Sequence, residues 1–390
     1  MNTRTRSPLD PWLAQEVARF DPRVPLEAAW LPPSSWYNNA RFFELERDTV
    51  FRNNWLIAAR SHQFAKAGDF VAGAIAGEPY VVVRGEDGVL RAFYNVCRHH
   101  AAQVAVGEGC AEALVCPYHG WTYALDGALK RAPELGAVKD FDRDKFGLVP
   151  MHVTEWCGLV FVSMATDPRP LAAEMGELER RLREMHLDEL QFVARRKYTL
   201  ACNWKVYVDN YLDGGYHVSY LHKGLAGQLD LDSYRTEIFG RYSIQSGAGA
   251  SGGGSGASGS DFSERIGDRV LYAWLYPNLM INRYGPMMDT NWVIPRGHDE
   301  TLVIFDYYFT RETAADAAFV EKSLAASDVV QAEDVGICES VQQGLLSSSY
   351  DKGRYSAKLE QGEYHFHRLL AADFRAASDG ADGVKSPATT

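Results

Sequence analysis

The sequence is poor in cysteine, has no long apolar run and carries no excess of basic residues. Its 390 residues include 6 cysteines, too few for a fold of this length built on disulfides, so we expect a reduced protein. No apolar run approaches the roughly 20 residues that cross a bilayer. The formal net charge of -11 argues against nucleic acids and membrane surfaces as partners.

The first residues also lack the marks of a secretory signal. The segment MNTRTRSPLDPWL has two arginines, but neither an apolar core nor a small-residue cleavage site. We therefore expect a soluble protein that resides in the cytoplasm.

Apolar residues make up 46% of the chain and aromatic residues 12%, and the length favours two domains. A polar segment with helical character covers 1–54 and leads into them. Short β-rich runs separated by turns predict an all-β domain over 55–165. Long strands and a helical stretch near 314–346 predict an α+β domain over 166–375, in which a large antiparallel sheet packs against a long helix. Residues 376–390 are expected to form a disordered tail.

One segment of the second domain has a different composition. Residues 246–260 read SGAGASGGGSGASGS, which offers nothing to bury and predicts a flexible loop. Either a passive surface insertion or a lid over a pocket agrees with this composition.

Two short runs contain the residues of a metal site. CRHH supplies Cys97 and His99, and CPYHGW supplies Cys116 and His119. Thiolates and imidazoles in this arrangement suit zinc or an iron–sulfur centre. Because each run supplies one cysteine and one histidine, the pattern favours a two-iron cluster with both thiolates on one iron and both imidazoles on the other.

The segment DNYLDGGYHVSYLH, 209–222, reads as an amphipathic helix with glycines at 214 and 215. Residues five apart lie about 140° apart around an ideal helix, so His217 and His222 cannot point the same way from one. We expect a local wide turn, or a helix that ends between them. The glycines either permit this distortion, admit another backbone at close range, or let two helices pack.

The Cys/His runs resemble the Rieske [2Fe–2S] motif. NWKVYVDNYLDGGYHVSYLH resembles the mononuclear iron motif of Rieske non-heme iron oxygenases, the α-subunits of ring-hydroxylating type. The resemblance implies a catalytic domain of the helix-grip, or START-like, class. It also implies a [2Fe–2S] cluster on the four Cys/His residues and Fe(II) held by two histidines and one carboxylate. Such a set leaves iron positions open for O₂ and substrate.

Carried over by position, the iron ligands implied by the resemblance are His217, His222 and Asp334. The family has an Asp five residues before a Glu, which selects Asp334 in QAEDVGICES, with Glu339 as the marker. Asp328 is the nearest alternative.

The resemblance further implies that an acid links the two metal sites. In the family this acid connects the first histidine ligand to a cluster histidine of a neighbouring subunit, within a head-to-tail homotrimer. Many relatives carry it three residues before that histidine, where this chain has Gly214, so the role falls to Asp213, four residues before. Asp209 is the fallback, and Asn210 is expected near the iron.

Several further segments resemble plant choline monooxygenases and their bacterial relatives, among them YPNLMINRYGPMMDTNWV, YDKGRYS and YHFHRLL. This resemblance implies that O₂ and two electrons convert choline to betaine aldehyde hydrate, the first step of glycine betaine synthesis. The electrons would come from a ferredoxin or a flavin reductase, with NAD(P)H upstream. The alternatives are the same machinery acting on another betaine or an aromatic acid, and a non-catalytic Rieske electron carrier.

A quaternary ammonium substrate is held by aromatic faces, aided by carboxylates. Arg283 is the residue that would instead favour an anionic substrate. The aromatic candidates on the predicted strands are Tyr272, Trp274, Tyr276, Tyr284, Trp292, Tyr307 and Tyr308, with Met287 and Met288 beside them.

Overall fold

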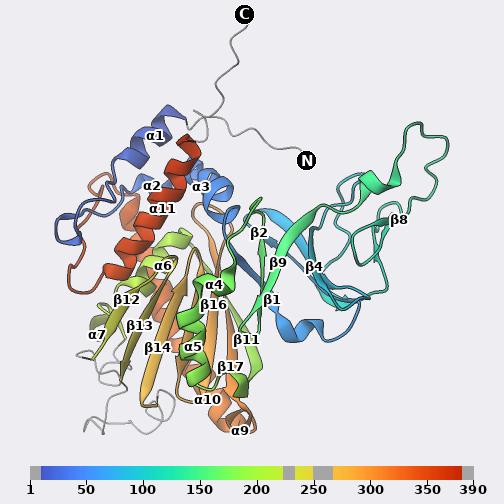
Figure 1. Ribbon diagram of the computed structural model, residues 1–390. Helices are drawn as coiled ribbons and strands as arrows, with labels where there is room; N and C mark the ends of the chain where they lie inside the picture. Colours follow the sequence, from blue (N-terminus) through green and yellow to red (C-terminus); the bar gives the residue numbers. More distant parts are fainter. Residues whose placement is uncertain (1–9, 223–232, 249–266, 380–390) are drawn as a thin grey trace, which may run out of the picture. The chain divides into compact units, whose positions relative to one another are not determined.

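The computed structural model describes residues 10–222, 233–248 and 267–379 (Figure 1). The chain divides into two compact units. One, here called the all-β unit, contains Phe51–Glu174. The other, the α+β unit, combines the residues up to Val50 with those from Met175 onward.

The all-β unit is built on a seven-stranded antiparallel sheet in the order β1-β10-β9-β4-β3-β2-β5. A second sheet, β6-β7-β8, has three short strands. This confirms the prediction of an all-β domain. The strands are β1 (Leu56–Arg60), β2 (Asp69–Ile75), β3 (Glu78–Arg84), β4 (Leu90–Tyr94), β5 (Glu108–Cys110), β6 (Leu114–Val115), β7 (Thr122–Tyr123), β8 (Leu129–Arg131), β9 (Pro150–Trp156) and β10 (Leu159–Ser163), with helical turns η3 (Ser61–Phe64), η4 (Arg143–Phe146) and α4 (Leu171–Glu174).

The α+β unit contains a second seven-stranded antiparallel sheet, in the order β11-β17-β16-β15-β14-β13-β12. The predicted large antiparallel sheet is thereby confirmed. Its central strands β15, β16 and β17 are buried at all but one or two positions, because helices cover the sheet. The strands are β11 (Leu190–Leu200), β12 (Arg235–Ile238), β13 (Tyr242–Ala248), β14 (Arg269–Leu275), β15 (Leu279–Tyr284), β16 (Met287–Pro295) and β17 (Thr301–Thr310).

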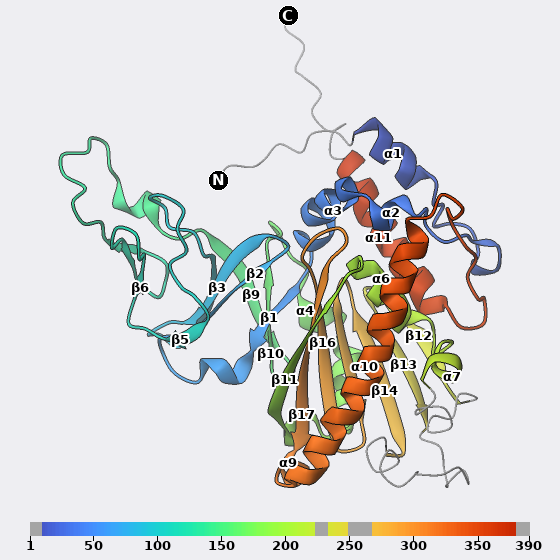
Figure 2. The same cartoon turned by 180° about the vertical axis from the view of Figure 1, so that it is seen from behind.

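A helix of 29 residues, α10 (Ala317–Leu345), crosses one face of this sheet (Figure 2). The shorter α5 (Gly176–Glu184) lies on the other face (Figure 1). The long helix on an antiparallel sheet gives the predicted helix-grip arrangement. A third helix, α6 (Trp204–Leu212), packs against both α10 and β16. The other helices are α1 (Pro11–Ala18), η1 (Leu26–Ala28), α2 (Ser35–Asn38), α3 (Ala40–Glu46), η2 (Arg47–Phe51), η5 (Leu187–Glu189), α7 (Val218–Leu221), α9 (Arg311–Ala314) and α11 (Gln361–Asp379).

Two predicted flexible segments overlap regular structure at one end. Strand β13 continues to Ala248, so the Gly/Ser-rich loop predicted from 246 begins later; its residues 249–260 lie outside the described part of the chain. Helix α11 runs to Asp379, because YHFHRLLAADF supplies an apolar face. The prediction of a disordered tail from 376 was therefore wrong at its start, and residues 380–390 are not described. None of the described helices has the length and apolar character of a membrane span.

Buried polar contacts hold the N-terminal segment against the rest of the α+β unit. Glu46 accepts a hydrogen bond of 2.7 Å from Trp204 Nε1 and forms an ion pair with Lys205 Nζ. Both side chains of the pair are fully buried. Burial raises the pKa of Glu46 and lowers that of Lys205, in each case against the effect of the partner's charge. The desolvation cost is therefore large, and each charge depends on the other.

Removing one member of this pair should destabilise the α+β unit severely. We expect Lys205→Met to lower the free energy of unfolding by about 3–5 kcal/mol, because Glu46 would be left buried without its cation. Urea unfolding followed by tryptophan fluorescence measures the change.

The control is the double variant Glu46→Gln/Lys205→Met, which removes both charges and keeps an acceptor for Trp204. It should recover most of the loss. A single Lys205→Met variant within about 0.5 kcal/mol of the parent would contradict this account of the pair.

Candidate metal centres and active-site pocket

Two loops of the all-β unit bring together the first predicted set of ligands. Cys97 follows β4 and Cys116 follows β6, and both thiols are buried. The two histidines lie at the outer side, with His99 Nδ1 3.1 Å from His119 Nδ1. Two imidazole nitrogens at this separation can share one metal ion, while the thiols face inward. The donor set therefore fits a cluster with one thiolate-bound and one imidazole-bound iron.

The two loops are built alike. In the first, Ala101 N donates to Cys97 O (3.0 Å) and Cys97 N donates to Ala102 O (2.8 Å). In the second, Gly120 N donates to Cys116 O (3.0 Å) and Cys116 N donates to Trp121 O (2.8 Å). Ala101 and Gly120 occupy equivalent positions and both have left-handed backbone, with φ of 63° and 68°. The backbone turns after the two cysteines are thus equivalent, although His99 is the second residue after its cysteine and His119 the third.

Tyr123 is a neighbour of this site that the sequence analysis missed. Its hydroxyl lies 3.3 Å from Cys97 Sγ and accepts a hydrogen bond from Arg98 N at 2.9 Å. Burial and the contact with Cys97 raise the pKa of Tyr123, so the hydroxyl keeps its proton and can donate it to the sulfur. Hydrogen bonds to cluster sulfurs tune the reduction potential.

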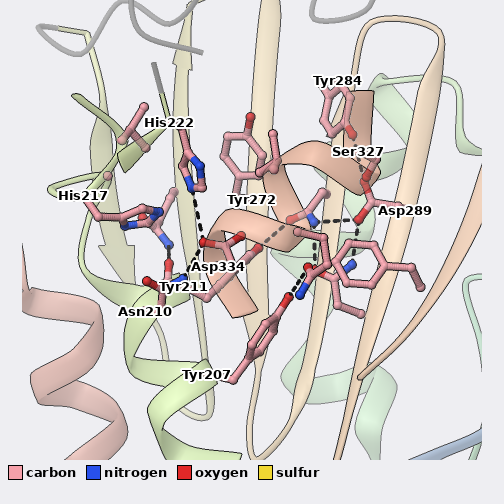
Figure 3. A pocket seen from close by; sticks show the side chains of 18 of the residues that line it. Tyr207, Asn210, Tyr211, His217, His222, Tyr272, Tyr284, Asp289, Ser327 and Asp334 are labelled. Carbon is pink, nitrogen blue, oxygen red and sulfur yellow. Dashed lines mark hydrogen bonds and ion pairs between the residues drawn. The ribbon is translucent and has the colours of Figure 1, made fainter. Parts of the chain in front are cut away.

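The second predicted set of ligands meets in the α+β unit. His217, His222 and Asp334 can bring one ligand atom each within 4.8 Å of one another (Figure 3). The histidines stand immediately before and after the single helical turn of α7, and the aspartate lies within α10. The centroids of the His217 and His222 rings are 4.9 Å apart.

One of the two expected alternatives, a helix that ends between the two histidines, is confirmed, because α7 ends at Leu221. The reading of 209–222 as one helix was wrong. Helix α6 ends at Leu212, before both of them. Gly214 and Gly215 follow with φ of 72° and 80°, a conformation that residues with a Cβ rarely adopt. A Cβ on Gly214 would also lie 2.2 Å from the carbonyl oxygen of Leu359. The glycine pair therefore serves both for a sharp turn and for close approach of another backbone.

A carboxylate contacts the Nδ1 atom of each histidine. Asp213 Oδ2 lies 2.6 Å from His217 Nδ1, and Glu333 Oε2 lies 2.7 Å from His222 Nδ1. Ionised carboxylates only accept hydrogen bonds, so each Nδ1 is the donor in these contacts, and in a neutral imidazole Nε2 then has the lone pair. His222 Nε2 is 3.2 Å from Asp334 Oδ1. The lone pairs needed for a metal are thus the ones left available.

Asp213 is fixed at the end of α6 by the turn that follows it. Its carboxylate accepts backbone N–H groups from Gly215 (2.9 Å), Tyr216 (3.1 Å) and His217 (2.9 Å). Asp209, one turn earlier, instead accepts the Tyr37 hydroxyl at 2.8 Å. Of the two acids considered from the sequence, Asp213 is the one that contacts His217.

The remaining predicted residues divide into near and distant ones. Asn210 Nδ2 donates to Asp334 Oδ1 at 2.9 Å, which orients this carboxylate. Asp328, the alternative ligand, accepts the hydroxyl of Tyr198 and lies 3.9 Å from Arg196. Glu339 accepts a backbone hydrogen bond of 2.9 Å from Ala201. Asp328 and Glu339 are not part of the group that surrounds the two histidines.

The electrostatics of this site favour a cation. Burial would lower the pKa of His222, but hydrogen bonds and charges from Asp334 and Glu333 outweigh it and raise the pKa. One carboxylate and two imidazoles form a hard and borderline donor set that suits Fe(II). The residues present therefore fit a mononuclear iron.

A cavity of about 170 Å³ adjoins this second site (Figure 3). Of the aromatic candidates from the sequence, Tyr272 and Tyr284 line it; the two methionines, the tryptophans and the other tyrosines do not. The described residues that line it are Tyr207, Asn210, Tyr211, Gly215, His217, Val218, His222, Tyr234, Gln245, Tyr272, Asn282, Tyr284, Asp289, Asn291, Phe305, Ser327, Val330, Gln331 and Asp334.

Several lining residues were missed by sequence reasoning. Tyr207 and Tyr211 stand at positions i and i+4 of one helix face, on which the predicted Asn210 also lies, and this spacing could have identified them. No comparable spacing in the sequence identifies Tyr234 and Asp289 as lining residues. Arg283 is buried away from the cavity, where its guanidinium donates to backbone carbonyls, among them Met185 O at 2.6 Å.

Both units of the chain match known domain families. Residues 54–142 match the Rieske [2Fe-2S] domain, and residues 187–374 match the catalytic domain of ring-hydroxylating alpha subunits. The chloroplastic choline monooxygenase of Arabidopsis thaliana is 45% identical over 369 residues, which covers 92% of this chain and 86% of that protein. The chain belongs to the Rieske non-heme iron oxygenases.

Further relatives of this Rieske oxygenase are monooxygenases. The carnitine monooxygenase oxygenase subunit of Escherichia coli (strain K12) is 36% identical over 365 residues, or 90% of this chain and 95% of that one. A solved quaternary ammonium Rieske monooxygenase in complex with an inhibitor has a TM-score of 0.79 and 30% identity, over 92% of this chain and 98% of that one. The predicted cofactors, a Rieske [2Fe–2S] cluster and a mononuclear iron, are confirmed by the two domains.

Exchanging Asp334 should remove the mononuclear iron and spare the cluster. We expect Asp334→Ala to lower the iron content from about three to about two atoms per chain, because two imidazoles alone hold Fe(II) weakly. Iron analysis and the visible absorption of the cluster measure the two sites separately.

Asp328→Ala is the matched control on the same helix, and it should retain all of the iron. If Asp334→Ala retained as much iron as Asp328→Ala, about three atoms per chain, Asp334 would not be a ligand.

Proposed function

We propose that this Rieske oxygenase hydroxylates a small quaternary ammonium compound, with choline as the preferred substrate and betaine aldehyde hydrate as the product. The observation that carries the proposal is the chemistry of the cavity wall. The wall combines tyrosine rings with carboxylates, and no Lys or Arg occurs among its described lining residues.

A quaternary ammonium group has no hydrogen to donate, so aromatic rings and negative charge are the means of binding it. The hydroxyls of Tyr207 and Tyr211 donate to Gln331 Oε1 (2.9 Å) and Asn282 Oδ1 (2.7 Å), which holds these side chains in the wall. Burial raises the pKa of both tyrosines well above the usual range, so the rings stay neutral. A bound cation would therefore meet aromatic carbon and carboxylate.

The same wall disfavours the alternative substrates. An aromatic acid or carnitine carries a carboxylate, which is best recognised by an arginine fork or a lysine. Arg283, the residue that could have served this purpose, is turned to the backbone instead. Choline carries a cation and a hydroxyl but no carboxylate, so it suits this cavity better than carnitine does.

The proposed assignment of the metal ligands follows the geometry of the two sites. Cys97, His99, Cys116 and His119 hold the [2Fe–2S] cluster, and His217, His222 and Asp334 hold the iron. The cluster supplies electrons, received from a ferredoxin or a flavin reductase, and the iron supplies the site of O₂ activation. One oxygen atom enters a C–H bond of the carbinol carbon, and two electrons and two protons reduce the other to water.

Asp213 is the proposed link between the centres. Its contact with His217 leaves it one side chain from the iron, and in a head-to-tail homotrimer it would meet a cluster histidine of the next subunit. A non-catalytic carrier would have no need for the second group of ligands, so we favour the oxygenase.

A substrate panel tests the proposed function. With reductant and O₂, we expect choline to give coupled O₂ uptake and betaine aldehyde hydrate, and carnitine and benzoate to give little, because the described wall offers no cation for their carboxylates. Product analysis by mass spectrometry is the measurement. Turnover of benzoate but not of choline would overturn the proposal.

Neutralising Asp213 should break the electron path. We expect Asp213→Asn to lower the rate of cluster reoxidation by O₂ and substrate roughly tenfold or more, since the amide keeps an acceptor for His217 but loses the charge. Stopped-flow absorbance follows the cluster, and iron analysis confirms that both sites are filled.

Asp209→Asn, one helical turn earlier, serves as the matched control and should change this rate little. If Asp209→Asn slowed reoxidation and Asp213→Asn did not, the link would belong to Asp209.

A further inference from the structure

A buried carboxylate lies in the wall of the cavity, on the sheet. Asp289 belongs to β16 and is 2% exposed, yet it lines the cavity. Asn282 Nδ2 (2.8 Å) and Asn291 Nδ2 (2.7 Å) donate to its Oδ1, and the Tyr284 hydroxyl (2.9 Å) donates to its Oδ2. Hydrogen bonds donated to both oxygens stabilise the ionised form. These three contacts hold the carboxylate in a fixed position.

This carboxylate is separate from the iron ligands. Asp289 pairs with Asn282 on β15 and Tyr307 on β17, in the middle of the sheet. The iron ligands come instead from the chain around α7 and from α10. Figure 3 shows Asp289 and Tyr284 on one side of the cavity, and His217 and His222 on the other. The cavity thus has a negative group at each end, and only one of them adjoins the histidines.

A row of tyrosine rings begins beside Asp289, where the Tyr284 hydroxyl contacts the carboxylate. The Tyr272 ring lies 6.2 Å from Tyr284 and 6.4 Å from Tyr234 between centroids. Burial raises the pKa of Tyr211, and the charge of Asp289 is among the further causes, so the field of this carboxylate extends into the cavity. A cation placed here would combine ring faces with an unscreened negative charge, because a buried site has a low dielectric constant.

We propose that Asp289 is the anionic anchor that binds the substrate's quaternary ammonium group. The inference rests on the proposed function and adds a specificity residue to it. With the ammonium group at Asp289, the opposite end of the substrate points toward His217, His222 and Asp334. Charge recognition and oxidation are then carried out by different carboxylates of one cavity.

The test compares choline with its uncharged isostere, 3,3-dimethylbutan-1-ol, in which carbon replaces the nitrogen. Anaerobic calorimetry with the iron-loaded enzyme gives both dissociation constants. The parent enzyme should bind choline more tightly than the isostere. Asp289→Asn keeps the shape but not the charge, so we expect its affinity for choline to fall about ten- to hundredfold, with less than about a threefold change for the isostere.

The outcomes separate the two proposals. If the parent enzyme prefers choline and Asp289→Asn keeps the same preference, the anchor is overturned while the proposed function stands. If the parent enzyme does not distinguish choline from the isostere, the quaternary ammonium substrate is overturned and the anchor with it.

A second variant covers the case in which Asp289→Asn does not retain iron. Asp289→Glu keeps the charge and moves it by one methylene, so the ratio of the two affinities should change by more than about threefold. An unchanged ratio would overturn the anchor. Tyr207→Phe is the matched control, since it alters a lining hydroxyl without changing a charge and should leave the ratio as in the parent.

Discussion

The imidazole of His222 is held from both sides by one helix, and the proposed iron site depends on these two contacts. Glu333 contacts its Nδ1 and Asp334 contacts its Nε2, so adjacent acids of α10 reach opposite nitrogens of the ring. The ring then joins α10 to the short chain segment around α7. His217 enters the same site because the glycine turn carries it there, with Asp213 behind it. A metal between these groups would complete contacts that the protein has already arranged.

The all-β unit positions its two cysteines and two histidines by using the same loop geometry twice. Two loops with the same backbone hydrogen bonds and the same left-handed residue place two thiols inside and two imidazoles outside. The outer histidines are the part of such a site that another molecule can approach, whereas the sulfurs are enclosed by Tyr123 and its neighbours. The burial pattern thus leaves the imidazole edge as the approachable side of the site.

Much of this structure could be predicted from the sequence, for identifiable reasons. The strands that contain LMINRY and TLVIFDYYFT could be predicted because they are long and apolar. Helix α10 could be predicted because its helical pattern continues without a break. The cluster ligands follow from spacing, since CxH and CxxH each fit one tight turn. The end of α6 was misplaced, because amphipathic spacing continues through Asp213 while the backbone reverses at two glycines. The cavity walls were mostly missed, because alternation along a strand does not say which face meets α10. It also does not say how far a cavity extends along one face: Tyr272 lines it, whereas Trp274, two residues later on the same face, packs against Phe366 of α11.

The close approach of Leu359 to Gly214 couples two parts of the chain that are far apart in sequence. Any side chain at position 214 would collide with that carbonyl, and an acid three residues before His217 is therefore sterically barred. The segment leading into α11 would have to move before such an acid could be accommodated. Replacement of the glycine therefore requires rerouting of that segment, so the position of the acid is tied to the packing of the C-terminal helix.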